Sequence, residues 1–312
     1  MAQQFIEIGT TPDVFFWALI EFKKKLYAGT YKLTGPKAYS YPPWTYLKTF
    51  DAGESIMEFA IFNNELYAAT EKKGYIYRMN SEDPTDWERV YDDAYLFVLN
   101  IKLFNGYLYA FICHTDGNSK VVRSSNGDDW STVANWSNLF LHDSVIYDNE
   151  FYLVGNKNDP HRIWAKKTSN GTTWIDAPEL CSDNVDGQWA PGAVSWRGKM
   201  WIGRGEMPSG LAKIYKYDGS TRAEVFSRTA PQPGAIAIFE NKIFATFVTG
   251  WKQVQTNYLY WSPTGETGTW KHIKTWTDKA DARSMGNFNK QLYLGIGNSL
   301  KRMLTPGFCA FV

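Results

Sequence analysis

The sequence predicts an all-β fold, a β-propeller of seven blades, because of an internal repeat, its period and the lack of helical patterning. Seven times, an aromatic residue is followed four positions later by a large apolar residue and then at once by a second aromatic residue. The apolar residue stands at positions 26, 66, 108, 151, 200, 243 and 292, so the steps of 40 to 49 residues suit one four-stranded blade. No stretch keeps a sustained 3.6-residue apolar period, which argues against helices.

Each copy of the repeat predicts a β-hairpin. Short apolar runs flank a polar stretch, and pairs such as Asn63-Asn64 and Asn105-Gly106 supply the chemistry of a tight turn. We expect the two aromatic columns to lie buried between adjacent sheets. The copies run from Phe22 to Tyr27, Phe62 to Tyr67, Phe104 to Tyr109, Tyr147 to Tyr152, Trp196 to Trp201, Phe239 to Phe244 and Phe288 to Tyr293.

A second signature follows the third expected strand of several units. Ser124 to Trp130 and Thr168 to Trp174 share the order hydroxyl residue, Asn, Gly and Trp, with looser copies at Ser81 to Trp87 and Ser262 to Trp270. A short polar side chain can hydrogen-bond its own turn, Gly accepts a positive φ, and the Trp packs between sheets. This signature predicts the turn into the fourth strand of a blade.

These turns resemble a shortened Asp-box, the Ser/Thr-x-Asp-x-Gly-x-x-Trp turn of sialidase-like propellers. The resemblance covers essentially the whole chain and implies that the turns mark blades and lie away from the binding face. Sialidases also carry three arginines, a Tyr nucleophile with a Glu partner, a further acidic residue and an early Arg-Ile-Pro element. Arg162-Ile163-Trp164 is the only partial match to that element and lies in mid-chain. The resemblance therefore does not extend to sialidase activity.

The spacing of the repeat also predicts how the ring closes. Phe5 lies 17 residues before Phe22, the spacing that separates Trp87 from Phe104 and Trp130 from Tyr147. Residues 5–9 are thus expected to complete the last blade as its outermost strand and to remove an open sheet edge; residues 308–312 are the alternative. We expect one domain, 1–312, with blades at 14–50, 57–92, 98–135, 142–178, 191–228, 233–276 and 282–312 plus 5–9.

Composition excludes several classes of protein. The formal net charge is +1, with 33 Lys and Arg against 32 Asp and Glu, so nothing indicates nucleic acid or a membrane surface as a partner. Cys113, Cys181 and Cys309 lack zinc-type spacing and are expected to be free thiols. No signal peptide or 18-residue apolar stretch is evident, which predicts cytoplasmic synthesis, with incorporation into a virion as one destination.

Candidate binding residues gather in the longer connections, because loops on a rigid scaffold are where binding groups concentrate. Exposed Trp with Arg and carboxylates would suit a sugar or a peptide; the alternative is that the two Trp side chains cover the ends of adjacent sheets. No catalytic set, metal site or cofactor motif is evident. The candidates are Trp189, Trp251, His161, Arg162, Arg204 and Glu206.

Three functional classes follow from this pattern. The first is a non-catalytic recognition or assembly module that binds a glycan or a protein, with a virus or phage structural subunit as one form of it. The second is a glycoside hydrolase or lyase of sialidase-like fold. The third is an intracellular protein-interaction scaffold.

Overall fold

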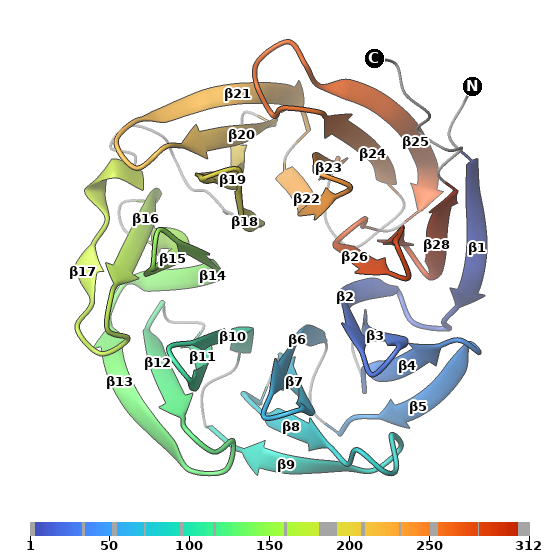
Figure 1. Ribbon diagram of the computed structural model, residues 1–312, viewed down its shortest axis with the longest axis vertical. Coiled ribbons are helices and arrows are strands. Elements are labelled where there is room, and N and C mark those ends of the chain that lie inside the picture. Colours follow the sequence, from blue (N-terminus) through green and yellow to red (C-terminus); the bar gives the residue numbers. More distant parts are fainter. Residues whose placement is uncertain are drawn as a thin grey trace.

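The computed structural model contains seven four-stranded antiparallel sheets arranged as blades around a central axis (Figure 1), which confirms the predicted seven-bladed β-propeller. The structure describes residues 4–32, 35–51, 55–71, 73–93, 97–114, 117–158, 161–180, 192–206, 210–230, 232–249, 255–279 and 281–304. In each blade the first repeat strand lies nearest the axis, and the following strands lie successively further out.

Each blade has four strands, which follow one another from the axis outward. Blade one contains β2 (Phe15–Phe22), β3 (Lys25–Tyr31), β4 (Lys37–Tyr41) and β5 (Thr45–Thr49), and blade two contains β6 (Ile56–Phe62), β7 (Glu65–Thr70), β8 (Ile76–Met79) and β9 (Trp87–Tyr91). Blade three contains β10 (Phe97–Phe104), β11 (Tyr107–Cys113), β12 (Ser119–Ser124) and β13 (Trp130–Trp136). Blade four contains β14 (Leu139–Tyr147), β15 (Glu150–Asn158), β16 (His161–Thr168) and β17 (Ile175–Asp176). Blade five contains β18 (Ala193–Trp196), β19 (Lys199–Glu206), β20 (Leu211–Tyr217) and β21 (Arg222–Thr229). Blade six contains β22 (Gln232–Phe239), β23 (Lys242–Val248), β24 (Gln255–Ser262) and β25 (Lys271–Lys279). Blade seven contains β26 (Ser284–Phe288), β27 (Gln291–Ile296), β28 (Ser299–Leu304) and β1 (Gln4–Thr10).

The antiparallel order gives the ring two different faces. The turns between the first and second strands lie at one end of every blade, as do the turns between the third and fourth strands in blades one to six; we call this end the hairpin face. The connections from the second to the third strand, and from each blade to the next, lie at the other end, which we call the connection face. A 3-10 turn, η1 (Pro178–Leu180), follows β17. In the described part of the chain, no helix is long or apolar enough to cross a bilayer.

The N-terminal strand closes the ring, as the repeat spacing predicts. β1 pairs antiparallel with β28, from Gln4 opposite Leu304 to Thr10 opposite Ser299. Figure 1 shows β1, at the start of the chain, forming the outer edge of the last blade. The alternative closing strand, residues 308–312, lies outside the described residues. The pairing joins the two ends of the described chain in one sheet, so no separate interaction is needed to hold the ring shut.

The aromatic columns are buried between blades, also as predicted. Tyr67 and Tyr109 are both 0% exposed. The ring of Tyr109 meets the ring of Phe151 in the next blade edge to face, with 5.6 Å between the ring centroids. This geometry is the one that aromatic pairs favour, so each column residue joins its own sheet to its neighbour.

The second signature forms tight turns on the hairpin face. The hydroxyl of Ser124 accepts a hydrogen bond from Gly127 N at 2.8 Å, and Trp130 Nε1 donates to the Gly127 carbonyl at 3.2 Å. Thr168 and Gly171 repeat the first contact at 2.9 Å, and Ser262 and Gly265 repeat it at 2.7 Å. Gly127 has φ +91°, which a residue with a Cβ rarely adopts. The turn is therefore held by its own side chain and positions the Trp that opens the outer strand.

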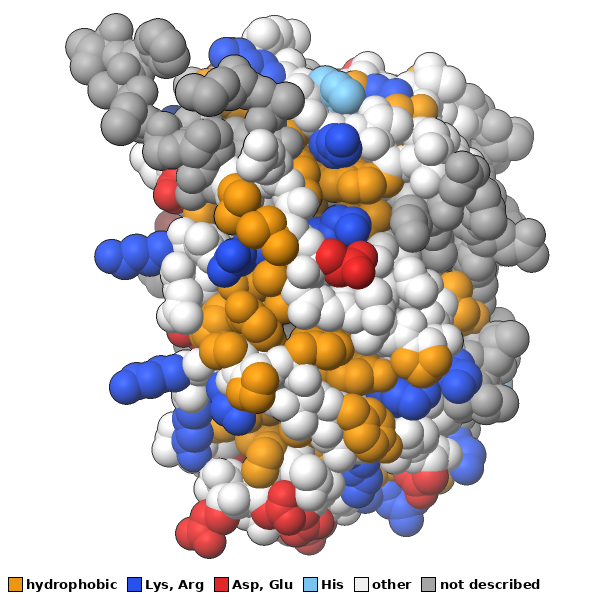
Figure 2. Space-filling view, turned by 90° about the vertical axis from the view of Figure 1, so that its right-hand side faces the viewer, with side chains coloured by type: hydrophobic (Ala, Val, Ile, Leu, Met, Phe, Trp, Pro, Cys, Tyr) orange, Lys and Arg blue, Asp and Glu red, His pale blue; other side chains and the backbone are white. Residues whose placement is uncertain are grey.

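The outer wall of the ring carries scattered apolar side chains. Figure 2 shows the side with β1, where hydrophobic groups are interspersed with Lys and Arg. Ile6 of β1 and Tyr46 of β5 are 40% and 51% exposed. Single exposed apolar side chains of this kind are ordinary on soluble proteins and carry no argument alone.

Candidate functional site in the central channel

The inner strands bulge where they begin, and the bulges turn side chains toward the axis. The register of the inner strand slips between Phe16 and Ala18 in blade one, and at the corresponding place in blades two, three, four and six. A bulge inserts an extra residue and re-aims its side chain. The residues at these bulges, with their equivalents in the other blades, surround a cavity of about 410 Å³ on the axis. Its polar and aromatic lining consists of Trp17, Glu58, Phe59, Asn100, Lys102, His142, Asp143, Arg283 and Ser284.

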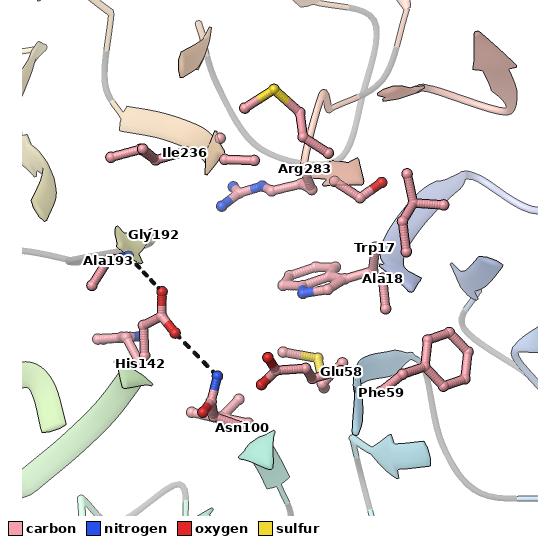
Figure 3. A pocket seen from close by; sticks show the side chains of 18 of the residues that line it. Trp17, Ala18, Glu58, Phe59, Asn100, His142, Gly192, Ala193, Ile236 and Arg283 are labelled. Carbon is pink, nitrogen blue, oxygen red and sulfur yellow. Dashed lines mark hydrogen bonds between the residues drawn. The ribbon is translucent and has the colours of Figure 1, made fainter. Parts of the chain in front are cut away.

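Trp17 and Arg283 project into this channel from neighbouring blades (Figure 3). The guanidinium carbon of Arg283 lies 5.5 Å from the centroid of a Trp17 ring, a cation–π distance. Arg283 Nε donates to Asp281 Oδ2 at 3.0 Å, and the Asp281 side chain is fully buried. The buried carboxylate fixes the arginine, so the channel presents a positioned cation beside an indole face.

Glu58, which lies beside Trp17 in Figure 3, forms an ion pair with Lys102 of the next blade. The Lys102 ammonium contacts Glu58 Oε1, and Glu58 Oε2 accepts from Ile101 N at 3.1 Å. Burial raises the pKa of Glu58, even though Lys102 opposes this. Burial alone would lower the pKa of Lys102, but the carboxylates of Glu58 and Asp143 more than offset it and raise this pKa. The pair joins blade two to blade three and keeps a charged group at the channel surface.

Asp143 joins three blades through hydrogen bonds. Its Oδ1 accepts from Asn100 Nδ2 at 3.0 Å and from Ser144 N at 2.7 Å, while its Oδ2 accepts from Ala193 N at 2.7 Å (Figure 3). Burial raises the pKa of Asp143, against these donors and Lys102. Protein groups thus occupy both oxygens of this carboxylate, and its first role is to hold β10, β14 and β18 in register around the axis.

His142 is held neutral next to Asp143. Its Nε2–H donates to Asn156 Oδ1 at 2.6 Å. Burial lowers the pKa of His142 to about 4, and the nearby Arg283 charge acts in the same direction. The imidazole is therefore a neutral hydrogen-bonding group at ordinary pH.

The channel as a whole combines an indole face, two cations and several oxygen acceptors. Glu58 and Lys102 balance each other, as do Asp281 and Arg283, so the cavity carries no large excess of one sign. Such a site suits a polar, ring-shaped ligand with both donors and acceptors better than it suits a strongly charged one. Among the described residues, no group of three or more His, Cys, Asp or Glu is arranged to hold a metal ion.

None of the sequence-predicted site residues that the structure describes belongs to this channel lining. Trp189 and Trp251 lie outside the described residues. His161 and Arg162 begin β16, where their backbones pair with Asn158 and Lys157.

Arg204 and Glu206 belong to strand β19 and not to a connection. Arg204 is 3% exposed, and its Nη1 lies 3.4 Å from the Tyr215 hydroxyl. Because β19 runs to Glu206 and β20 begins at Leu211, the connection expected around Arg204 is shorter in the structure than the sequence indicates.

The aromatic repeat marks the contacts between blades and therefore does not predict which residues line the channel. A signal was nevertheless present at fixed distances before the first column aromatic. Charged, polar or large side chains stand four or five residues ahead of it, at Trp17, Glu58, Asn100, His142, Asp143, Arg283 and Ser284. Reading these two positions across the seven units would have predicted the lining of the channel.

The comparisons with known proteins agree with the fold. No protein-family model matches this chain, and no curated protein matches it in sequence. Among solved structures, YCF48 from Cyanidioschyzon merolae is similar with a TM-score of 0.65 and 11% identity, covering 97% of this chain and 98% of that one. A putative 6-phosphogluconolactonase of Bacteroides fragilis has a TM-score of 0.64 and 11% identity, covering 92% and 89%. A chain of the nidogen/laminin complex has a TM-score of 0.51 and 13% identity, covering 73% and 84%. Likeness at these identities shows the fold alone, and a propeller is consistent with a binding module.

Proposed function

We propose that this protein is a non-catalytic recognition module that binds a sugar residue of a glycan in its central channel. The observation that carries the proposal is the convergence of the Trp17 indole, the Arg283 guanidinium and the Glu58 carboxylate on one cavity of about 410 Å³. Sugar rings stack an apolar face on an aromatic side chain and direct hydroxyl groups to charged and amide partners.

The ligand enters from the connection face. The lining residues lie at the beginnings of the inner strands, and these strands begin at that face. The connection that contains Trp189 ends directly before Gly192, a residue of the lining. Trp189 and Trp251, with Arg162 and Glu206, are therefore proposed as the outer part of the same site, where a longer glycan chain would continue.

Binding is favoured over hydrolysis by the state of the two channel carboxylates. A glycosidase needs one carboxyl group to give up a proton and the other to attack or to activate water. Asp143 already accepts three hydrogen bonds from the protein, and Glu58 accepts from Ile101 N and from Lys102. Carboxylates held in this way can accept a further hydrogen bond from a sugar hydroxyl, but their existing partners oppose proton transfer and nucleophilic attack.

A glycoside hydrolase is the second candidate, because burial raises the pKa of both Glu58 and Asp143, as it does for catalytic acids. Aryl glycosides and sialosides distinguish the two functions. The recognition module leaves them intact, whereas turnover that is lost in Glu58→Gln at unchanged stability would replace our proposal with the enzyme.

A glycan array followed by calorimetry on the best-bound oligosaccharide tests the binding function. We expect Trp17→Ala to weaken binding at least ten-fold, and Arg283→Lys to weaken it several-fold because the planar fork is lost. Tyr46→Ala, at an exposed aromatic site on the outer wall, is the matched control and should bind as the wild type does. Equal affinity of Trp17→Ala and the control would move the site out of the channel.

The loop residues need a separate variant. Trp189→Ala combined with Trp251→Ala should reduce affinity for a long oligosaccharide more than for a monosaccharide, because only the long ligand reaches the connection face. An equal loss for both ligands would place these residues inside the primary site.

The turns at Ser124, Thr168 and Ser262 support kinship with the Asp-box propellers. Protein partners are supported by the nidogen/laminin complex among the similar structures. A protein partner would make the chain part of an intracellular scaffold or of a larger assembly such as a virion. The genes next to this one test the assembly setting, since capsid or tail genes there would favour a virion subunit.

A further inference from the structure

Three exposed aliphatic side chains lie on consecutive inner strands near the hairpin face. Ile61 of β6, Leu103 of β10 and Ile146 of β14 are 38%, 44% and 41% exposed. We call these three residues the aliphatic arc. Figure 1 shows β6, β10 and β14 following one another around the channel.

The arc comes from one position of the repeat. Each member directly precedes the first column aromatic and pairs across its hairpin with a buried apolar residue, namely Leu66, Leu108 or Phe151. At the same position, blades one, five and seven carry the exposed polar residues Glu21, Ser195 and Asn287. Blade six carries Ile238, which is partly buried. The fold itself does not require an apolar side chain there, and the aliphatic side chains that are exposed at this position are those of blades two to four.

The size of the arc suits a short helix. Sheets that pack face to face lie about 10 Å apart, so three members span roughly 20 Å. A helix rises 1.5 Å per residue, so about 13 residues cover that length. An amphipathic helix of this length makes between three and four turns, so its apolar stripe can place at least one side chain per turn over the arc.

The turns around the arc are acidic. Arg78 of β8 and Lys167 of β16, basic side chains at this face, are each paired with carboxylates, among them Asp128 and Glu150. The hairpin-face turns of blades two to four contain the exposed carboxylates of Glu82, Asp129 and Asp148. These turns, at 63–64, 80–86, 105–106, 125–129, 148–149 and 169–173, are all described and contain no Lys or Arg. The corresponding turn of blade one carries Lys23 and Lys24. The apolar arc and the acidic turns thus occupy the same half of the hairpin face.

We propose that the aliphatic arc docks a basic amphipathic helix of a protein partner. Its apolar stripe covers Ile61, Leu103 and Ile146, and its Lys and Arg side chains face the acidic turns. Electrostatic complementarity selects the partner and accelerates encounter, while the apolar contact supplies the affinity. The proposal is independent of the channel ligand, since the arc lies at the opposite end of the inner strands from the connection face.

The test uses an 18-residue peptide of Leu and Lys with Leu at helical spacing, titrated against the full chain by fluorescence anisotropy. A peptide of the same composition, with Leu placed off the helical period, is the control ligand. We expect the amphipathic peptide to bind at least ten-fold more tightly than the control, and the triple variant Ile61→Ser, Leu103→Ser, Ile146→Ser to lose this preference. The variant Asp129→Lys with Asp148→Lys should weaken binding several-fold at low salt and less at high salt.

Ile175→Ser is the matched protein control, because Ile175 is 55% exposed but lies in the outer strand of blade four. It should bind as the wild type does. Because all substituted side chains are exposed, melting temperatures should stay close to that of the wild type and exclude misfolding. Equal binding of the two peptides, or a triple variant that binds as well as Ile175→Ser, would overturn the proposal. So would a concentration-dependent dimer that disappears in the triple variant, since the arc would then be covered by a second copy of this chain.

Discussion

The hydroxyl of Tyr109 in blade three fills the space that a Cβ on Gly171 of blade four would need. The same relation joins Tyr67 of blade two to Gly127 of blade three. The second aromatic column and the glycine of the turn signature are therefore complementary parts of one contact between blades. This explains why the two signatures keep the same phase along the sequence.

Replacing Gly171 by Ala should destabilise the protein by about 2 to 4 kcal/mol. Gly171 has φ +76°, where a Cβ costs about 1 to 2 kcal/mol, and the new methyl group would also collide with Tyr109. Gly106→Ala is the matched control. Gly106 has φ +77° but nothing within 4 Å of the new Cβ, so only the backbone cost remains. Urea denaturation of both variants measures the difference, and an equal loss would show that the contact between blades contributes nothing.

Removing the Tyr109 side chain, on the other side of this contact, should lower the free energy of unfolding by more than Gly171→Ala does. Tyr109 is fully buried against Phe104 and Phe151, so Tyr109→Ala removes roughly 3 to 5 kcal/mol of unfolding free energy. Tyr46→Ala, at a half-exposed aromatic site, should change stability by less than about 0.5 kcal/mol. Chemical denaturation of both variants gives the comparison. A Tyr109→Ala protein as stable as Tyr46→Ala would contradict a structural role for the column.

Deleting residues 1–9 should lower the melting temperature by about 5 to 10 °C or make the chain insoluble. The deletion removes most of β1, and with it the pairing to β28 and the packing of Phe5 on Trp276. Deleting residues 305–312 is the control, because β1 already occupies the outer edge of β28. Calorimetry checks both. If the second deletion proves the more damaging, closure depends on the C-terminal residues.

The fold could be predicted from the sequence because its periodic features are packing requirements. Each column aromatic must fill a gap between two sheets, and each gap recurs once per blade, so blade number and burial follow directly from the repeat. The closing strand was predictable for the same reason, since Phe5 keeps the spacing of the other outer strands. Neither inference needed any knowledge of side chains near the axis.

The site was harder to predict because bulges decide which side chains reach the channel. In a regular strand His142 and Asp143 would point to opposite sides of the sheet, yet the bulge lets both line the cavity. Arg204 shows the converse error. It looked like a loop residue between glycines, but β19 continues through it and buries it. Strand length and bulges depend on pairing with neighbouring strands, which local sequence does not encode.

His142 offers a measure of how tightly the channel wall is held. Its pKa is about 4 in the folded protein, mainly because it is buried, against about 6.5 for an unfolded chain. Below pH 6.5 the unfolded chain therefore takes up a proton that the folded protein accepts only near pH 4. Linkage then requires that the free energy of unfolding falls as the pH drops through this window. The raised pKa values of Glu58 and Asp143 act with the opposite sign, because those carboxyl groups favour the fold when protonated.

The variant His142→Asn isolates the histidine from these carboxyl groups. Its unfolding free energy, measured by urea denaturation between pH 7.5 and pH 4, should fall less steeply than that of the wild type. The difference in unfolding free energy between the two proteins should be constant above about pH 7. As the pH falls from 6.5 to 4, the unfolding free energy of the variant should rise relative to that of the wild type, by up to about 3 kcal/mol at pH 4. His114→Asn is the control, since His114 lies outside the channel lining. A difference between wild type and His142→Asn that stays constant down to pH 4 would mean that His142 takes up its proton as readily in the fold as in water, and the channel wall would then be open to solvent at this position.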